Sequence, residues 1–286
     1  MKFAFFLGCQ IPIRLKQYEI SSRAVLERLG VELTDIEAFN CCGYPFRNID
    51  FKTYLLASAR NLALAQQKKL DVMTLCQCCY GALKKAHVLL KENAPLREEV
   101  NAVIQREGLA YEGEGRVRHL LSVLHQEIGV DAIKKRVAKP FQGLKIAAHY
   151  GCHALRPSQV VQFDDPAMPS IFDRLVEATG AESIDWLMRL ECCGAPLLGI
   201  HDDLSQEMMF KKIRNGRASG ADYLCTACTY CQIQFDTVQQ NLLAQQGSPL
   251  SLPSILYPQL LGLSMGVPAE LLGLNLNKML IRDIGP

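Results

Sequence analysis

Two copies of one short string, Cys41-Cys42-Gly43-Tyr44-Pro45 and Cys192-Cys193-Gly194-Ala195-Pro196, decide how this chain of 286 residues is interpreted. A disulfide between adjacent cysteines would need a strained ring, because the bridging geometry is narrow. In a helix or a strand, the two side chains would point in different directions. Two such pairs therefore indicate two built sites for a thiophilic metal or cluster.

The cysteines around each pair repeat as well. A Gly-Cys step precedes each pair, at Gly8-Cys9 and Gly151-Cys152, and a Cys-x-x-Cys follows it. The second cysteine of the pair lies 34 positions before Cys76 in one half and 35 positions before Cys228 in the other. Matched order and near-equal intervals are typical of a duplicated unit.

Short apolar runs lead into the cysteines, and helical patterns follow them. The runs predict buried strands at 2–7, 72–75, 144–149 and 223–224. The helical patterns predict helices over 20–29, 54–67, 80–90, 172–179, 208–217 and 233–243. This alternation predicts an α/β fold of two similar domains, each a mainly parallel sheet flanked by helices, related by internal duplication. Cysteines just past the strand ends would then gather at one edge of each sheet, where α/β folds place ligands.

The boundary between the two halves is expected near Lys139-Pro140. An N-terminal domain would cover 1–139 and a C-terminal domain 140–286. The stretch 92–139 interrupts the repeat and predicts two helices, over 96–106 and 116–127, that would pack between the halves. Its Gly113-Glu114-Gly115 turn lacks a third glycine and a preceding strand, so it is not a dinucleotide-binding fingerprint.

Composition excludes several classes of protein. A net charge of +2 with 21% charged residues leaves no basic excess for phosphates, which argues against nucleic-acid binding. The apolar run that ends at Cys9 is too short for the core of a signal peptide. No segment approaches the ~20 apolar residues of a membrane span. Twelve cysteines in a chain with a real apolar core indicate metal or redox chemistry in a reducing cytoplasm rather than a disulfide framework.

Each half offers five thiolates once one Cys-x-x-Cys is chosen. We choose Cys76-x-x-Cys79 and Cys228-x-x-Cys231, which leaves Cys78 and Cys225 over, although Cys225-x-x-Cys228 is equally legal by spacing. Zinc takes four ligands in tetrahedral geometry, and a cubane iron–sulfur cluster takes four cysteines. Spacing alone therefore does not explain the fifth cysteine. It also does not decide between zinc and an iron–sulfur cluster.

The sequence resembles the cysteine-rich CCG domain family, and within it the B-type subunits of heterodisulfide reductases, over essentially the whole chain. The resemblance rests on both Cys-Cys-Gly motifs and on the segments 5–9, 74–81, 149–153 and 253–263. It implies that each half holds a noncubane [4Fe-4S] cluster on five cysteines, one of which bridges irons. Zinc in one half is the alternative cofactor. Carried over, the cluster ligands are Cys9, Cys41, Cys42, Cys76 and Cys79 in the first half and Cys152, Cys192, Cys193, Cys228 and Cys231 in the second. The extra Cys78 and Cys225 depart from this pattern and leave a different choice of ligands open.

The resemblance also implies a catalytic subunit of a heterodisulfide reductase-like complex, an oxidoreductase acting on sulfur groups. Two clusters would face a shared cavity and reduce, or form, a disulfide or related sulfur–sulfur bond, which takes two electrons. The chain has no flavin or nicotinamide motif, so electrons would arrive from two partners in the same complex, a ferredoxin-like iron–sulfur subunit and a flavoprotein subunit. The alternatives are an electron-transfer CCG subunit of a glycolate, lactate or succinate dehydrogenase complex, and a zinc-stapled scaffold.

Histidines near the cysteine motifs could supply protons to the thiolate products. His149 and His153 flank the second Gly-Cys step and are the candidates for catalysis, and His201 is a third. A lone histidine is more often structural than functional. The cations that could meet an anionic substrate, or simply face solvent, are Lys84, Lys85 and Arg156.

Overall fold

The computed structural model describes residues 1–246, 250–281 and 284. This part of the chain contains two four-stranded parallel sheets with the same strand arrangement, ordered β2-β1-β3-β4 and β6-β5-β7-β8. The predicted α/β fold of two similar domains is therefore confirmed. The strands are β1 (Lys2–Phe6), β2 (Glu32–Thr34), β3 (Asp71–Thr74), β4 (Val117–His119), β5 (Lys145–Ala148), β6 (Glu182–Ser183), β7 (Tyr223–Thr226) and β8 (Ser254–Leu256).

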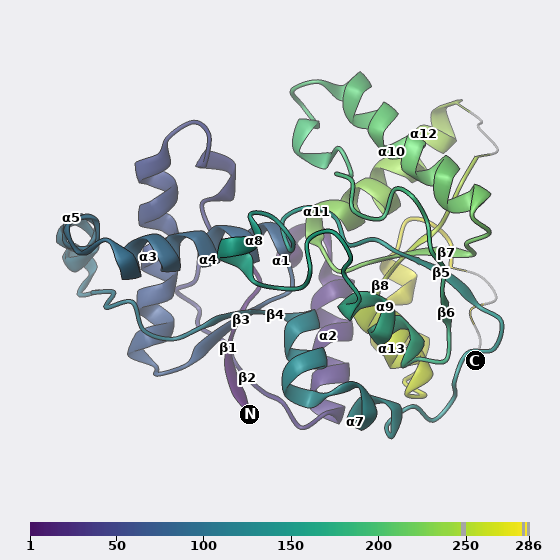
Figure 1. Cartoon of the computed structure of the whole chain (residues 1–286), viewed down its shortest axis with the longest axis horizontal. Coiled ribbons are helices and arrows are strands. Elements are labelled where there is room, and N and C mark those ends of the chain that lie inside the picture. The colour runs from purple at the N-terminus through teal and green to yellow at the C-terminus, as the bar shows by residue number, and fades with distance from the viewer. Residues whose placement is uncertain (247–249, 282–283, 285–286) are drawn as a thin grey trace.

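Helices connect the strands (Figure 1), because a parallel neighbour can be reached only through a crossover. In the first half they are α1 (Ile11–Arg14), α2 (Lys16–Arg28), α3 (Phe51–Gln67), α4 (Gln77–Glu92), α5 (Ala94–Ile104), α6 (Leu120–Ser122) and α7 (Val130–Lys134). In the second half they are α8 (Ser158–Val161), α9 (Ile171–Glu177), α10 (Asp202–Ala218), α11 (Thr229–Gln232), α12 (Gln239–Gln246) and α13 (Tyr257–Ser264). Among the helices that the structure describes, none has the length and apolar character that crossing a bilayer requires.

Short 3₁₀ and π segments complete the chain. Two of the 3₁₀ turns directly follow the Cys-Cys-Gly strings, at η1 (Tyr44–Phe46) and η4 (Ala195–Leu197). The π-helical segments are η3 (Val123–Ile128) and η5 (Ile233–Val238), and the other 3₁₀ turns are η2 (Gln105–Glu107), η6 (Ala269–Leu272) and η7 (Leu274–Leu276).

Two elements of the stretch 92–139 differ from the prediction. The helix expected over 96–106 is α5, which packs on α3 and α4 of the first half and not between the halves (Figure 1). The helix expected over 116–127 is wrong at its start, because Val117–His119 form β4 and pair with β3 through Val72 and Thr74. Helical turns begin only at Leu120. The stretch thus supplies the fourth strand of the first sheet, as β8 does in the second, so the duplication reaches further than the cysteine spacing indicates.

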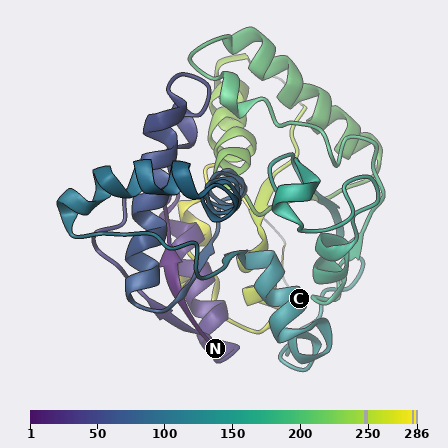
Figure 2. The same ribbon diagram turned by 60° about the vertical axis from the view of Figure 1, so that its left-hand side comes forward.

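The two halves share a continuous buried apolar core. Helix α13 near the end of the chain packs against α2 of the first half, and the two lie side by side in both views (Figures 1 and 2). The Arg28 guanidinium donates a hydrogen bond to the carbonyl of Met265 across this contact, at 2.9 Å. Helix α6 and η3 likewise contact α9 of the second half. This packing fixes how the two cysteine-bearing sheet edges face each other.

Candidate metal centre

Cysteines lie just past the carboxyl ends of parallel strands, as predicted. Cys9 follows β1 and Cys76 follows β3, and Cys152 and Cys228 follow β5 and β7 in the same way. The carboxyl ends of parallel strands meet at one edge of a sheet. Segments far apart in sequence are therefore brought together at one site in each half.

Glycine is required directly before the first cysteine of each half. Gly8 and Gly151 have φ values of +66° and +68°, a left-handed conformation that other residues rarely adopt. A Cβ atom at Gly8 would lie 3.1 Å from the Cys79 sulfur, and one at Gly151 would lie 2.9 Å from Oε1 of Gln77. These steps turn the chain tightly enough to bring the sulfurs of distant segments into contact.

The sulfurs of each half form a continuous series of contacts. Neighbouring thiols in these series are within hydrogen-bonding reach of each other. In the first half the series runs Cys9, Cys41, Cys42, Cys79 and Cys76. In the second half it runs Cys152, Cys192, Cys193, Cys231 and Cys228. We call these the first and second thiol sets. Their members correspond position by position.

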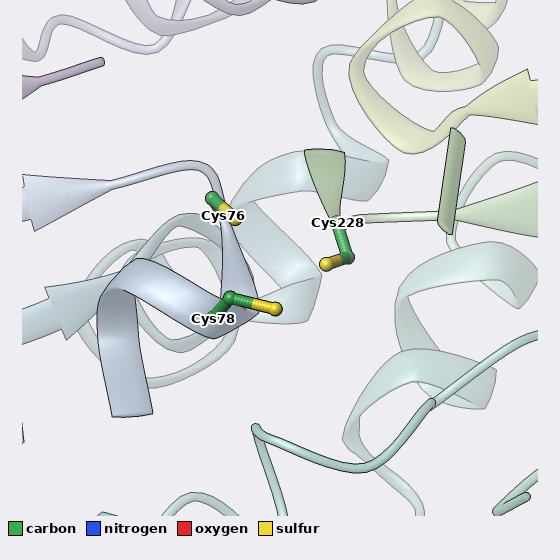
Figure 3. A group of neighbouring side chains, drawn as sticks. All are labelled: Cys76, Cys78 and Cys228. Atoms are coloured by element: carbon green, nitrogen blue, oxygen red, sulfur yellow. The ribbon is translucent and has the colours of Figure 1, made fainter. Parts of the chain in front are cut away.

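The two thiol sets meet at their ends. The sulfurs of Cys76, Cys78 and Cys228 all lie within 4.8 Å of one another, and Figure 3 shows Cys78 and Cys228 pointing toward each other from the two halves. Cys76 and Cys228 immediately precede α4 and α11, so each lies at the start of a helix. Cys225, by contrast, lies inside β7 at 0% exposure, and burial alone raises the pKa of its thiol.

The first cysteine of each Cys-Cys pair favours the thiolate form. Hydrogen bonds from Cys42 and then from Cys9 lower the pKa of Cys41 to about 3. Hydrogen bonds from Cys152 and then from Cys193 lower the pKa of Cys192 to about 2. The thiolate is the metal-binding form of cysteine, so both Cys-Cys pairs begin with a residue prepared to bind metal.

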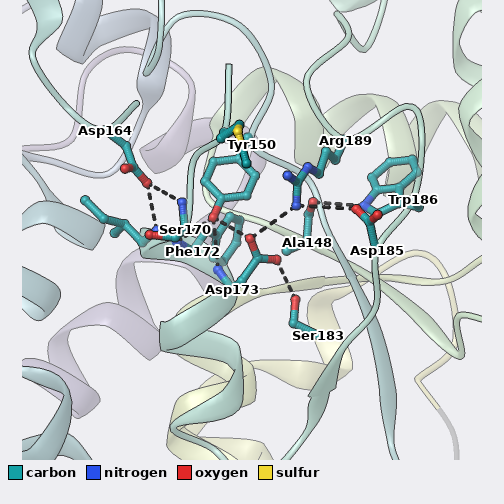
Figure 4. A network of polar contacts seen from close by, with 12 residues as sticks. Ala148, Tyr150, Asp164, Ser170, Phe172, Asp173, Ser183, Asp185, Trp186 and Arg189 are labelled. Carbon is teal, nitrogen blue, oxygen red and sulfur yellow. Dashed lines mark hydrogen bonds and ion pairs between the residues drawn. The ribbon is translucent and has the colours of Figure 1, made fainter. Parts of the chain in front are cut away.

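A polar network holds the loops that carry Cys152 and Cys192 (Figure 4). The Tyr150 hydroxyl donates to the Asp173 carboxylate at 2.7 Å, and the Tyr150 N–H donates to the Arg189 carbonyl at 3.1 Å. The Arg189 guanidinium lies 3.6 Å from the same carboxylate. Tyr150 precedes Gly151-Cys152 and Arg189 precedes Cys192-Cys193, so one carboxylate fixes both loops relative to α9.

His119 bridges the backbones on either side of the junction, and the sequence patterns do not indicate it. Its Nε2 lies 3.2 Å from the Leu75 carbonyl and 3.1 Å from the Ala227 carbonyl, while its Nδ1 accepts from the Leu121 N–H at 3.3 Å. Burial lowers the pKa of His119 to about 4, which keeps the ring neutral. The proton is therefore on Nε2, shared between the carbonyls that precede Cys76 and Cys228. No motif surrounds this residue in the sequence.

The three histidines selected from the sequence lie in different surroundings, and His153 alone among them contacts the cysteine sulfurs. His153 lies at the centre: its Nδ1 is 3.2 Å from the Cys152 sulfur and 3.6 Å from the Cys78 sulfur. His149 is 1% exposed, packs edge-on against Phe235, and has no hydrogen-bond partner for either ring nitrogen among the described residues. His201 is exposed and caps α10.

A cavity of about 370 Å³ opens between the residues that follow the two Cys-Cys pairs. Its lining includes Tyr44-Pro45 from the first half and Ala195-Pro196 from the second. Tyr230 and Tyr44 also line a smaller pocket among the thiols of the first set, so the two hollows are neighbours. The cations that line it are Arg14 and Arg47, whereas Lys84, Lys85 and Arg156 do not.

The donor set fits a sulfur-rich iron cluster. Each half presents five thiols in a series of neighbouring pairs, all buried or partly buried. Cys78 adds a further thiol at the junction. Soft thiolates select iron–sulfur clusters, zinc or Cu(I). Five ligands exceed the four that tetrahedral zinc or a cubane cluster takes.

Comparison with known proteins places the chain in a family. The model of the cysteine-rich CCG domain matches residues 3–84 and 146–236. The B subunit of ferredoxin:CoB-CoM heterodisulfide reductase from Methanosarcina mazei is 35% identical over 96% of this chain and 93% of that protein. The 8-methylmenaquinol:fumarate reductase membrane anchor subunit of Wolinella succinogenes is also 35% identical, over 96% of both chains.

A further relative and a solved structure are also similar to the chain. A protein of Archaeoglobus profundus, described as similar to the B subunit of heterodisulfide reductase, is 33% identical over 94% of this chain and 92% of that protein. The crystal structure of a hypothetical protein from Helicobacter pylori matches with a TM-score of 0.76 at 18% identity. That match covers 98% of this chain but only 52% of the other, and it shows the fold alone. Because the domain model matches both halves and relatives match nearly the whole length, the chain belongs to the cysteine-rich CCG family.

Proposed function

We propose that the chain is the catalytic iron–sulfur subunit of a heterodisulfide reductase-like complex, which reduces or forms a sulfur–sulfur bond at two noncubane [4Fe-4S] clusters. The observation that carries this proposal is the pair of corresponding thiol sets that meet at Cys76 and Cys228. Splitting one sulfur–sulfur bond takes two electrons. Two equivalent sites in contact suit a reaction in which each site takes one sulfur.

The two thiol sets are the proposed cluster ligands, with Cys78 and Cys225 outside them. Their continuity supports this assignment, because each set contains one Gly-Cys cysteine, one Cys-Cys pair and one Cys-x-x-Cys. When bound, such clusters supply electrons one at a time and an iron that is electrophilic toward thiolate sulfur.

The cavity between the halves is the proposed substrate entrance. Its walls come from both Cys-Cys-Gly strings, so a bound disulfide would be reached from both thiol sets. Arg47 stacks on the ring of Tyr44, with 4.9 Å between the guanidinium carbon and the ring centroid. Together with Arg14 it gives the cavity a positive charge that would orient a substrate with an anionic arm.

His153 is the proposed proton donor. Its Nε2 lies 3.2 Å from the Arg47 guanidinium, which can only donate hydrogen bonds. Nε2 is therefore the acceptor, and the proton of the neutral ring is on Nδ1, directed at the sulfurs of Cys152 and Cys78. A proton held at this atom is within reach of a thiolate formed between the two sets.

Electrons would come from two partners in the cytoplasm, a ferredoxin-like iron–sulfur subunit and a flavoprotein subunit of the same complex. The name of the Methanosarcina mazei relative, which is one subunit of a ferredoxin:CoB-CoM heterodisulfide reductase, supports this assembly. Twelve cysteines without a disulfide suit a reducing compartment.

An electron-transfer role in a flavoprotein dehydrogenase complex is the second candidate. The specific observation in its favour is the Wolinella succinogenes relative, a fumarate reductase subunit that is as similar to this chain as the heterodisulfide reductase relative. The lactate utilization protein A of Macrococcus caseolyticus, 23% identical over 82% of this chain, points the same way.

Reduction of disulfides by the anaerobically purified complex separates the two candidates. With a reduced viologen dye as electron donor, we expect oxidation of the dye that depends on an added heterodisulfide and yields two thiols per two electrons. An iron-loaded complex that passes electrons to or from a flavoprotein dehydrogenase but leaves every disulfide intact would reject the first candidate and support the second.

A further inference from the structure

The two halves place different residues under their Cys-Cys pairs. Asn61 on α3 and Lys212 on α10 each lie 19 positions after the second cysteine of the pair. Both are buried, at 1% and 0% exposure. The Asn61 amide donates to the Cys41 carbonyl at 3.1 Å, and the Lys212 ammonium donates to the Glu191 carbonyl at 3.0 Å. Corresponding positions therefore support the same loop, one with a neutral group and one with a cation.

The Lys212 ammonium is enclosed by neutral groups. It also donates to the Met188 carbonyl, and its nitrogen lies 5.1 Å from the centre of the Trp186 ring. Among the described residues, the ion pairs formed with carboxylates do not include Lys212. Burial lowers the pKa of Lys212 to about 8, and the nearby thiols of Cys231 and Cys193 offset part of this effect.

A buried cation is strongly unfavourable unless an opposite charge faces it. The sulfurs of the second thiol set are the groups placed to supply that charge, because the ammonium is held against the carbonyl of Glu191, directly before Cys192-Cys193. The thiols of Cys231 and Cys193 favour the charged form of Lys212. Exposed Glu191 also favours the charged form, less than Cys231 and Cys193 do but more than Cys192 does. The first thiol set has no such cation at the corresponding position, because Asn61 is neutral.

We propose that Lys212 is the counter-charge of the second thiol set and makes the cofactor of the second half easier to reduce than that of the first half. A nearby positive charge stabilises an added electron, and net charge is one of the factors that set the potential of a protein-bound cluster. The proposal rests on the proposed function for its redox consequence. Lys212 would give the two duplicated sites different reduction potentials. Electrons arriving from a partner would then reduce the cofactor of the second half first.

The test is an anaerobic redox titration followed by EPR on the complex with Lys212→Gln. The amide retains hydrogen-bond donors for the loop, as Asn61 does in the first half, but removes the charge. We expect the reduction equilibrium of one centre to shift about tenfold toward the oxidised form, equivalent to about 59 mV for one electron, with the other centre unchanged. Lys211→Gln, on an exposed neighbour, is the matched control and should leave both centres unchanged. Equal potentials in wild type and Lys212→Gln, with iron content intact, would overturn the proposal.

A second measurement does not depend on iron. Co²⁺ is titrated into the reduced, metal-free chain, because thiolates of any metal site gain from a facing cation. Lys212→Gln should weaken one class of Co²⁺ binding about tenfold, and Lys211→Gln should not. Unchanged Co²⁺ affinity would overturn the counter-charge. If the purified protein lacks iron but Lys212→Gln weakens Co²⁺ binding, the proposed function fails while the role of Lys212 stands.

Discussion

The sulfurs of Cys76 and Cys228 lie within 4.8 Å of each other, although the two residues belong to different halves of the chain. The contact joins the end of the first thiol set to the end of the second. Both residues immediately precede a helix, and the carbonyls before them share the His119 ring. The duplication therefore yields two sites that touch, which is the arrangement that a two-electron reaction at one sulfur–sulfur bond can use.

Replacement of the second cysteine of either pair should abolish disulfide cleavage. Cys42→Ala or Cys193→Ala removes a thiol from the middle of one set, and the iron content of that half should fall while the partner subunits still bind. Cys225→Ala is the matched control, because Cys225 is equally buried but lies inside β7. Iron analysis and viologen-driven turnover check the prediction. Full turnover in Cys42→Ala would contradict the catalytic role.

Cys78 and Cys79 should differ as ligands although they are adjacent. Cys79 contacts both Cys42 and Cys76 within the first set, so Cys79→Ala should lose the iron of that half. Cys78 lies at the junction and contacts Cys76 and Cys228, so Cys78→Ala should keep nearly all of its iron. The iron contents of the two variants, measured side by side, test this prediction. Loss of iron in Cys78→Ala but not in Cys79→Ala would make Cys78 a ligand in place of Cys79.

His119 should make the protein less stable in acid. Its pKa is about 4 in the folded protein against about 6.5 when unfolded. The unfolded chain therefore binds the extra proton first, and stability is retained above pH 6.5 and lost as the pH falls toward 4. The full effect is about 3 kcal/mol.

Chemical denaturation of wild type and His119→Gln between about pH 7 and about pH 5 measures this effect. At about pH 7 the two proteins should have similar stability, because the Gln amide can still donate to the buried carbonyls from the position of Nε2. The variant should lose stability less steeply as the pH falls, because its amide does not titrate. Parallel pH profiles for the two proteins would show that His119 does not titrate in this way.

The position of the proton on His153 predicts an order among its variants. Asn presents its amide near the place of Nδ1, whereas Gln reaches toward Nε2. His153→Asn should therefore retain more disulfide cleavage than His153→Gln, and His153→Phe should lose about a hundredfold or more. Iron content should be the same in all three, because His153 is not a proposed ligand. Equal rates for the Asn and Phe variants would leave His153 without a role in proton transfer.

Local features of the site can be predicted from the sequence, and relations between the halves cannot. The positions of Cys9 and Cys152 after strands are predictable, because an apolar run and a Gly-Cys step are adjacent in the chain. Strand β4 escapes prediction, since three residues are too few to show periodicity. The contact of Cys78 with Cys228 depends on how α13 packs against α2 and how the halves meet, which no short pattern encodes.

The burial of Lys212 could not be predicted from the sequence either. Its correspondence to Asn61 is visible in the sequence once the repeat is aligned, but helix patterning treats a lysine as a solvent-facing residue. Only the packing of α10 shows that the ammonium is buried beneath the second Cys-Cys pair.

The metal content of anaerobically purified protein tests the central claim most directly. Iron, acid-labile sulfide and zinc are measured on one sample, and EPR spectra are recorded before and after a thiol is added. Two clusters predict about four irons per half, with matching sulfide and little zinc, and an EPR signal that changes with thiol. One zinc per half without iron would contradict the account.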